Sequence, residues 1–112
     1  CYLEVKNVTL DGGNGLAMFP DSVTARGTKH LRELVLMTEQ GFRSMLLFCV
    51  QLSDAKSFSV ASNIDPVYAS TLSEALDKGV EIIAWRTLIT SENIVLQKPI
   101  RVTLDVLGQK II

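Results

Sequence analysis

The fold is decided by residues 43–52, which read Arg43-Ser44-Met45-Leu46-Leu47-Phe48-Cys49-Val50-Gln51-Leu52. Because a strand points successive side chains to opposite faces, the unbroken apolar centre of this stretch predicts a strand that is buried on both faces. Such a strand is typical of the middle of a sheet with helices on either side. The apolar run is far shorter than the roughly 20 residues of a membrane helix. We therefore expect an α/β domain and no membrane span.

Two amphipathic helices are predicted on either side of this central stretch. The first is expected to begin at Asp21 or Ser22, either of which can cap a helix, and to run to about Gln40. The second is expected to begin at Pro66, because proline suits the first helical position, and to end at Gly79. Helices in these places predict crossover connections between parallel strands.

Three further segments have strand character: Tyr2–Leu10, Val80–Thr90 and Ile94–Leu104. The last two are expected to form a hairpin, which gives a mixed sheet in the order β-α-β-α-β-β with an antiparallel edge at its C-terminal end. Between these elements, residues Leu16–Phe19 are interpreted as a short apolar link and Ser53–Ile64 as an irregular polar segment.

Composition limits the class of protein. The chain has 112 residues, 47% hydrophobic and 21% charged, which predicts one globular domain. Its formal charge of −1 argues against a nucleic-acid binder that is basic over its whole surface, so any phosphate site must be local. The two cysteines, Cys1 and Cys49, do not form a disulfide framework, and Cys49 is expected to be a reduced core residue. We therefore expect a reducing, cytoplasmic location.

Glu4 and Lys6 are the first candidate site residues. They are two apart in the first strand, so they project from the same face, while Leu3 and Val5 are expected to point toward a core. A carboxylate can hold Mg²⁺ or Mn²⁺, and the Val5 carbonyl is a candidate second ligand. A neighbouring lysine can orient water and stabilise charge on a phosphate during phosphodiester cleavage. The plain alternative is a solvated surface pair.

The second candidate site is the opening part of the first helix, where Arg26, Lys29 and His30 follow Asp21. A helix N-terminus attracts anions, and added cations there predict a phosphate-binding site. Cations in the opening turns oppose the helix dipole, a local conflict of the kind found at functional sites. The alternative is a solvated helix face in which Arg26 and Lys29 pair with Glu33.

Five blocks of sequence carry a family resemblance: Tyr2–Leu10, Leu16–Asp21, Thr24–Leu34, Ile64–Tyr68 and Gly79–Ile82. Together they resemble the C-terminal half of the sugar fermentation stimulation protein A (SfsA) family and extend over nearly the whole chain. The resemblance implies an N-terminal OB-like barrel, absent from this chain, followed by a core like that of the PD-(D/E)xK restriction endonucleases. Residues 1–112 are then expected to be a single nuclease-like domain, the C-terminal fragment of a longer protein.

The resemblance also implies roles for residues. Glu4 and Lys6 match the Glu-x-Lys half of the nuclease site, whose leading Asp lies upstream in the family and is missing here. Asp21, Arg26, Lys29 and His30 match the helix block and are expected near Glu4, in contact with nucleic acid. Family members are linked to DNA binding and to regulation of sugar use, maltose in particular.

Three functions remain open at this point. The first is a protein that binds duplex DNA and regulates sugar metabolism. The second is a nuclease that depends on Mg²⁺ or Mn²⁺ and uses Glu4 and Lys6, inactive as this fragment alone. The third is a nuclease-like fold that binds a protein or metabolite instead, because a fold does not fix a function. Assembly into a homo-oligomer is also left open.

Overall fold

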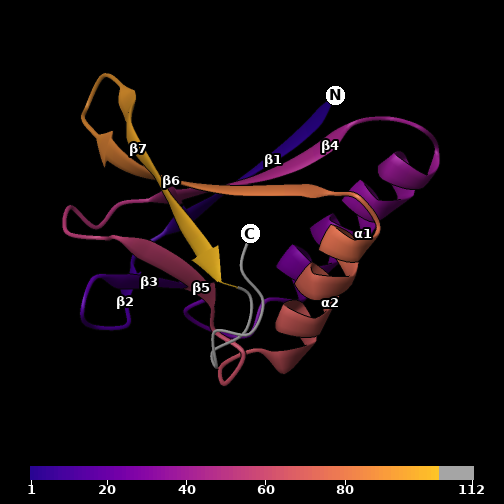
Figure 1. Cartoon of the computed structure of the whole chain (residues 1–112), viewed down its shortest axis with the longest axis horizontal. Helices are drawn as coiled ribbons and strands as arrows, with labels where there is room; N and C mark the ends of the chain where they lie inside the picture. The colour runs from indigo at the N-terminus through magenta and orange to yellow at the C-terminus, as the bar shows by residue number, and fades with distance from the viewer. Residues whose placement is uncertain (104–112) are drawn as a thin grey trace.

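Residues 1–103 are described by a computed structural model, which contains a curled mixed sheet of seven strands and two helices in this part of the chain (Figure 1). Leu104, the last residue of the predicted final strand, lies outside the described residues. The elements in chain order are β1 (Tyr2–Val8), β2 (Leu10–Asp11), β3 (Leu16–Phe19), α1 (Ala25–Glu39), β4 (Ser44–Val50), β5 (Ser57–Val60), α2 (Pro66–Asp77), β6 (Glu81–Ile89) and β7 (Ile94–Thr103).

The strand order across the sheet is β1-β4-β6-β7-β5-β3-β2. Strands β1, β4 and β6 are parallel neighbours, with α1 in the first crossover and α2 in the second, so the predicted crossover helices are confirmed. The predicted β6–β7 hairpin is also confirmed. The predicted position of β7 at an edge is wrong, because β5 pairs with its other side and continues the sheet. The edges are β1 and β2 instead.

Two strands were missed by the sequence interpretation. The predicted apolar link is β3 and part of the predicted irregular segment is β5, and these two strands pair in parallel. Both are four residues long, too short for a periodic pattern to identify them. Their pairing, and not their own sequence, makes them strands.

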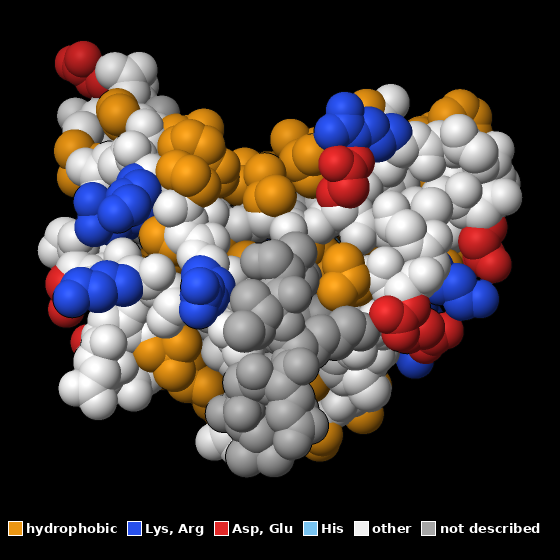
Figure 2. Space-filling model, in the orientation of Figure 1, with side chains coloured by type: hydrophobic (Ala, Val, Ile, Leu, Met, Phe, Trp, Pro, Cys, Tyr) orange, Lys and Arg blue, Asp and Glu red, His pale blue; other side chains and the backbone are white. Residues whose placement is uncertain are grey.

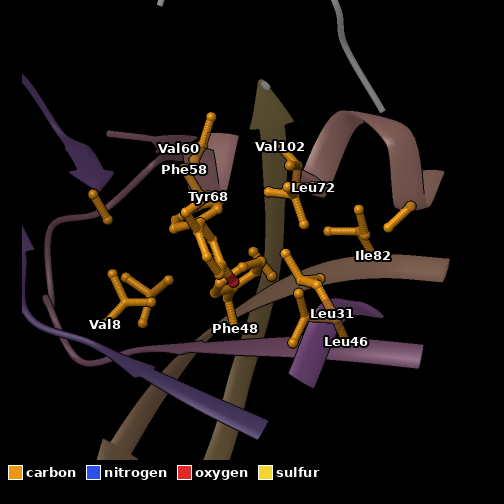
Figure 3. Close-up of a cluster of buried hydrophobic side chains, with 14 of the residues drawn as sticks. Val8, Leu31, Leu46, Phe48, Phe58, Val60, Tyr68, Leu72, Ile82 and Val102 are labelled. Atoms are coloured by element: carbon orange, nitrogen blue, oxygen red, sulfur yellow. The ribbon is translucent and has the colours of Figure 1, made fainter. Parts of the chain in front are cut away.

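Both helices pack against the same face of the sheet, so the prediction of helices on both faces is wrong (Figure 1). Leu46, Phe48 and Val50 of β4 are buried on this inner face, and they share one core with residues of α1 and α2 (Figure 3). Met45 and Leu47 point to the other face and are only half-buried. The apolar run therefore reflects a deeply buried inner face and a partly covered outer face.

The direction of β1 is also opposite to the prediction. Leu3 and Val5 are 55% and 47% exposed on the outer face, whereas Glu4 and Lys6 project from the inner face together with the buried Val8. Alternation correctly predicted that Glu4 and Lys6 share one face of β1. Which of the two faces of β1 is the inner one is decided by the pairing of β1 with β4. In Figure 2, hydrophobic side chains gather in the notch at the top of the view, beside the tip of the β6–β7 hairpin.

The helix boundaries follow their caps. Helix α1 begins at Ala25, later than predicted, because the Thr24 hydroxyl accepts a hydrogen bond from the Gly27 N–H at 3.0 Å and fixes the first turn. Helix α2 begins at Pro66, as predicted, and Asp65 is its cap. Cys49 is buried and free, as expected. In the described part of the chain, neither helix has the length and apolarity that crossing a bilayer requires.

Candidate functional site

Glu4, Lys6 and His30 form a cluster between β1 and α1. The Lys6 Nζ lies 3.2 Å from Glu4 Oε1 and 2.8 Å from His30 Nδ1. The same Glu4 oxygen lies 3.2 Å from His30 Nδ1. The side chain of Glu4 is 32% exposed, that of Lys6 15% and that of His30 21%, so the cluster is partly desolvated but open to solvent. The structure therefore brings together three of the predicted site residues.

The position of each side chain follows from its element. Glu4 and Lys6 pair in register with Leu46 and Phe48, so they extend over the inner face of the sheet. Helix α1 covers that face and presents His30 at the border between its buried and exposed sides. The charged atoms of Glu4, Lys6 and His30 therefore meet at the border of the core, between the edge strand β1 and helix α1.

The proton positions in the cluster are constrained by chemistry. A lysine ammonium has only donors, so its short contact makes His30 Nδ1 an acceptor and places the proton of the neutral ring on Nε2. A protonated ring would instead pair with Glu4 and repel Lys6. The contact with Lys6 and a hydrogen bond donated to Glu4 are therefore alternatives at the same ring nitrogen.

A groove of about 290 Å³ opens beside this cluster. Its polar wall is made of Glu4, His30 and Glu33, and the other lining residues are Tyr2, Leu3, Leu34 and Met37. Sequence reasoning treated Glu33 only as a partner for cations and missed it as a groove residue. The signal was its spacing, because residues three apart on a helix are neighbours and Glu33 follows His30 by one turn.

Asp21, Arg26 and Lys29 are exposed and do not line this groove. Helix spacing nevertheless places Arg26 one turn before His30 on the same side of α1, because residues four apart are neighbours. Lys29 is next to His30 along the chain. These two cations therefore lie on the rim outside the cluster, and a role in phosphate contact stays a prediction.

Asp65 holds the N-termini of the two helices together. Its Oδ1 accepts a hydrogen bond from the Tyr68 N–H and its Oδ2 accepts one from the Thr24 N–H, both at 2.9 Å. These bonds, the one from Thr24 first, hold the pKa of Asp65 below its usual value, because they favour the charged carboxylate. The start of α1 is thus already capped by protein groups, so a phosphate there would depend on side-chain cations more than on the helix dipole.

Tyr68 was not predicted as a site residue. It is fully buried, and its hydroxyl has no hydrogen-bond partner within residues 1–103. Burial raises the pKa of Tyr68, and the negative charges of Glu4 and Asp65 raise it further, so the phenol is neutral. Tyr68 could have been predicted as a site residue only if the sequence indicated an acceptor for its hydroxyl, and the spacing of residues indicates none.

The fit of these residues to a divalent cation is partial. Glu4 supplies the hard oxygen that Mg²⁺ or Mn²⁺ prefers, and the Val5 carbonyl is adjacent in the chain. Over residues 1–103 no group of three or more His, Cys, Asp or Glu side chains is placed to hold a metal. A cation at Glu4 would therefore also need water, a phosphate oxygen or another carboxylate, and Mg²⁺ often takes such ligands.

Comparison with known proteins gives consistent matches. The family described as "Sugar fermentation stimulation protein RE domain" matches residues 1–93. A sugar fermentation stimulation protein homolog of Ruegeria sp. (strain TM1040) is 54% identical over 94 residues, which is 84% of this chain and 40% of that protein. The homolog of Saccharophagus degradans is 47% identical over 102 residues, 91% of this chain and 44% of that protein. The chain thus spans less than half the length of these relatives.

A solved structure is similar over the same region. It is described as the structure of Pyrococcus furiosus SfsA in complex with Ca²⁺. The similarity has a TM-score of 0.81 at 32% sequence identity, and it covers 89% of this chain and 43% of the Pyrococcus furiosus chain. The curled mixed sheet with its two helices therefore has a close structural counterpart.

Proposed function

The chain belongs to the sugar fermentation stimulation protein family, and from that premise we propose that it is the part of a DNA-binding protein that contacts duplex DNA through α1. The observation that carries this proposal is the placement of two exposed cations, Arg26 and Lys29, on the rim of the Glu4–Lys6–His30 cluster. Neither cation forms an ion pair within residues 1–103. Both are thus available for phosphate oxygens, which cations contact without reading the base sequence.

The finer fold assignment is part of the same proposal. A parallel β1–β4–β6 core with Glu4 and Lys6 on its edge strand supports a PD-(D/E)xK nuclease-like core. An N-terminal OB-like domain in the intact protein agrees with the greater length of the relatives. A role in sugar use is supported by the name of the family, sugar fermentation stimulation protein; maltose as the specific sugar is a further part of this proposal.

Salt dependence tests the DNA-binding proposal. The affinity of the intact protein for a labelled duplex, measured by fluorescence anisotropy, should fall linearly on a plot of log K against log salt, because cations that neutralise phosphates release counterions. Arg26→Ala and Lys29→Ala should each reduce the slope by about 1 and weaken binding to all sequences alike.

Lys78→Ala is the matched control. Lys78 is an exposed lysine at the C-terminal cap of α2, and its neighbour Gly79 lies against Thr38 in the last part of α1, far from the cluster. Its removal changes the net charge equally but should leave the slope unchanged. A slope that no α1 variant alters would refute contact through α1.

A second candidate function, a nuclease dependent on Mg²⁺ or Mn²⁺, is favoured by the Glu4–Lys6 geometry. A divalent cation would supply charge stabilisation on a phosphate and a more acidic bound water. Glu4, with the Val5 carbonyl and an upstream Asp of the intact protein, would hold the cation. Lys6, fixed at 2.8 Å from His30 Nδ1, would donate to a phosphate oxygen or to the attacking water. That Pyrococcus furiosus SfsA has been solved in complex with Ca²⁺ supports a divalent cation as a ligand in this family.

Nicking of supercoiled plasmid tests this candidate. The intact protein should convert plasmid to the open circle only with Mg²⁺ or Mn²⁺, and Lys6→Ala should lower the rate by at least about a hundredfold, the scale of losing one positioned charge-stabilising group. Lys29→Ala, which changes a cation outside the cluster, should reduce binding but retain nicking at saturating protein. Wild-type protein that stays inert with every divalent metal would remove the nuclease candidate and leave the DNA-binding proposal standing.

A further inference from the structure

Tyr68 presents a buried donor without an acceptor. Its side chain is fully buried, and the hydroxyl finds no partner among the described residues. A hydroxyl taken out of water without a hydrogen bond costs roughly 1–3 kcal/mol in proteins. Buried polar groups in native proteins are nearly always satisfied, so an unpaired one points to a water, an ion or a functional partner.

The surroundings of the ring place this hydroxyl under the cluster. The Tyr68 ring packs edge-on against Phe19, with 5.3 Å between the ring centres, and its Cε1 lies 3.0 Å from the place where a Cβ on Gly27 would stand. Gly27 is one helical turn before His30. The ring therefore lies beneath the first turns of α1.

The hydroxyl is directed toward β4, the strand that pairs with β1. In Figure 3 the Tyr68 side chain extends in the direction of Phe48, with its oxygen at that end. Phe48 is the register partner of Lys6 across the β1–β4 pair. Burial raises the pKa of Tyr68, and the negative charge of Glu4 raises it further, so the hydroxyl is present as a donor.

We propose that Tyr68 is a positioning residue of the Glu4 site, whose hydroxyl donates a hydrogen bond to a water molecule that in turn donates to the Glu4 carboxylate. Lys6 and His30 both contact the same Glu4 oxygen, Oε1. A donor from below fixes the plane of the carboxylate and so the direction in which it presents an oxygen to a cation. This role rests on the proposed metal site at Glu4, but the hydrogen bond itself does not require a metal.

The first measurement is made without metal. NMR of the intact protein should show a slowly exchanging Tyr68 hydroxyl proton, absent in Tyr68→Phe, that moves upfield in Glu4→Gln because the accepting water loses its charged partner. Glu33→Gln removes an equal charge from the same groove and should leave the proton in place. A hydroxyl proton that does not respond to Glu4→Gln overturns the proposal.

The second measurement is Mn²⁺ binding by calorimetry. Tyr68→Phe keeps the ring and should weaken the Mn²⁺ affinity about tenfold, the scale expected when a partner of a metal ligand is lost. Thr38→Val is the matched control, because Thr38 also has a buried hydroxyl with no partner among residues 1–103, about 12 Å along α1 from His30. Both variants should remain folded, as checked by thermal unfolding, and only Tyr68→Phe should alter Mn²⁺ binding.

The two measurements separate this inference from the proposed function. If wild-type protein binds no Mn²⁺, the metal site fails, and the hydroxyl proton still decides whether Tyr68 is linked to Glu4. If wild-type protein binds Mn²⁺ and Tyr68→Phe binds it equally well, the metal site stands and the positioning role is refuted.

Discussion

Gly27 links the fold to the candidate site at the scale of a single residue. A Cβ at this position would lie 2.9 Å from Thr24 Cγ2 and 3.0 Å from Tyr68 Cε1. Thr24 caps α1, and Tyr68 lies beneath the Glu4–Lys6–His30 cluster. The absence of a side chain therefore lets α1 approach α2 closely enough to bring His30 to β1.

Gly27→Ala should destabilise the protein by about 1–2 kcal/mol in urea unfolding. Alanine gains roughly 1 kcal/mol of helix propensity. Because its Cβ would meet both Thr24 and the buried Tyr68 ring, overpacking should cost about 2–3 kcal/mol, the upper part of its usual range, so the clash dominates. Gly12→Ala is the control, because its Cβ would meet mainly the flexible end of Met18. A Gly27→Ala variant as stable as wild type would show that α1 and α2 shift apart easily.

At the scale of elements, the relative position of α1 and α2 depends on the carboxylate of Asp65. It caps α2 through the Tyr68 N–H and reaches the capping residue of α1 through the Thr24 N–H. Asp65 is 3% exposed, so water replaces neither bond easily. One side chain thus sets the relative position of two elements.

Asp65→Ala should lower the free energy of unfolding by about 2–3 kcal/mol at pH 7, because two N–H groups lose a charged acceptor. The backbone donors lower the pKa of Asp65 in the folded state. Its contribution is therefore full above the ordinary carboxyl pKa of about 4 and is lost as pH falls through the lower, folded value. Urea unfolding of both proteins from pH 7 to pH 2 should show the difference shrinking at the acid end.

Asp21→Ala is the comparison for this effect. Asp21 is exposed near the same helix start, so its removal should change stability by less than about 0.5 kcal/mol. A gap between wild type and Asp65→Ala that stays constant down to pH 2 would contradict the assigned cause.

At the scale of the whole molecule, opening of the fold can be measured at β4, which lies between β1 and β6 in the sheet. Cys49 on β4 is 3% exposed, and burial raises the pKa of its thiol, whereas Cys1 is exposed. Thiolate is the reactive form, so both burial and the raised pKa protect Cys49. Its labelling therefore reports opening of the sheet.

In a Cys1→Ser variant, the single remaining thiol should react with a disulfide reagent at least about a thousandfold more slowly than in denaturant, because reaction requires opening of a stable fold. In 8 M urea, Cys49 in this variant and Cys1 in a Cys49→Ser variant should react at similar rates. Fast labelling of Cys49 in native protein would mean that β4 opens locally without unfolding.

Residue patterns predicted the long elements and part of the site. The existence of a strand at the apolar run of β4, the proline at the start of α2 and the hairpin of β6 and β7 were predicted correctly, because long apolar segments and caps are local signals. The prediction that helices cover both faces of β4 was wrong, because the placement of the helices depends on the tertiary structure. The short strands β3 and β5 were missed, since neither is long enough to show a period. Of the site, the alternation of β1 placed Glu4 and Lys6 together. Glu33 was missed although its spacing from His30 is a local signal, whereas Tyr68 was missed because its role depends on neighbours distant in sequence.

The sequence by itself determined that Glu4 and Lys6 share one face of β1, because side chains alternate along any strand. It did not determine which face is the inner one. The parallel pairing with β4 decided that, by turning Glu4 and Lys6 under α1 and leaving Leu3 and Val5 exposed. Local chemistry sets the direction of side chains relative to one another, but only long-range pairing sets their direction relative to the core.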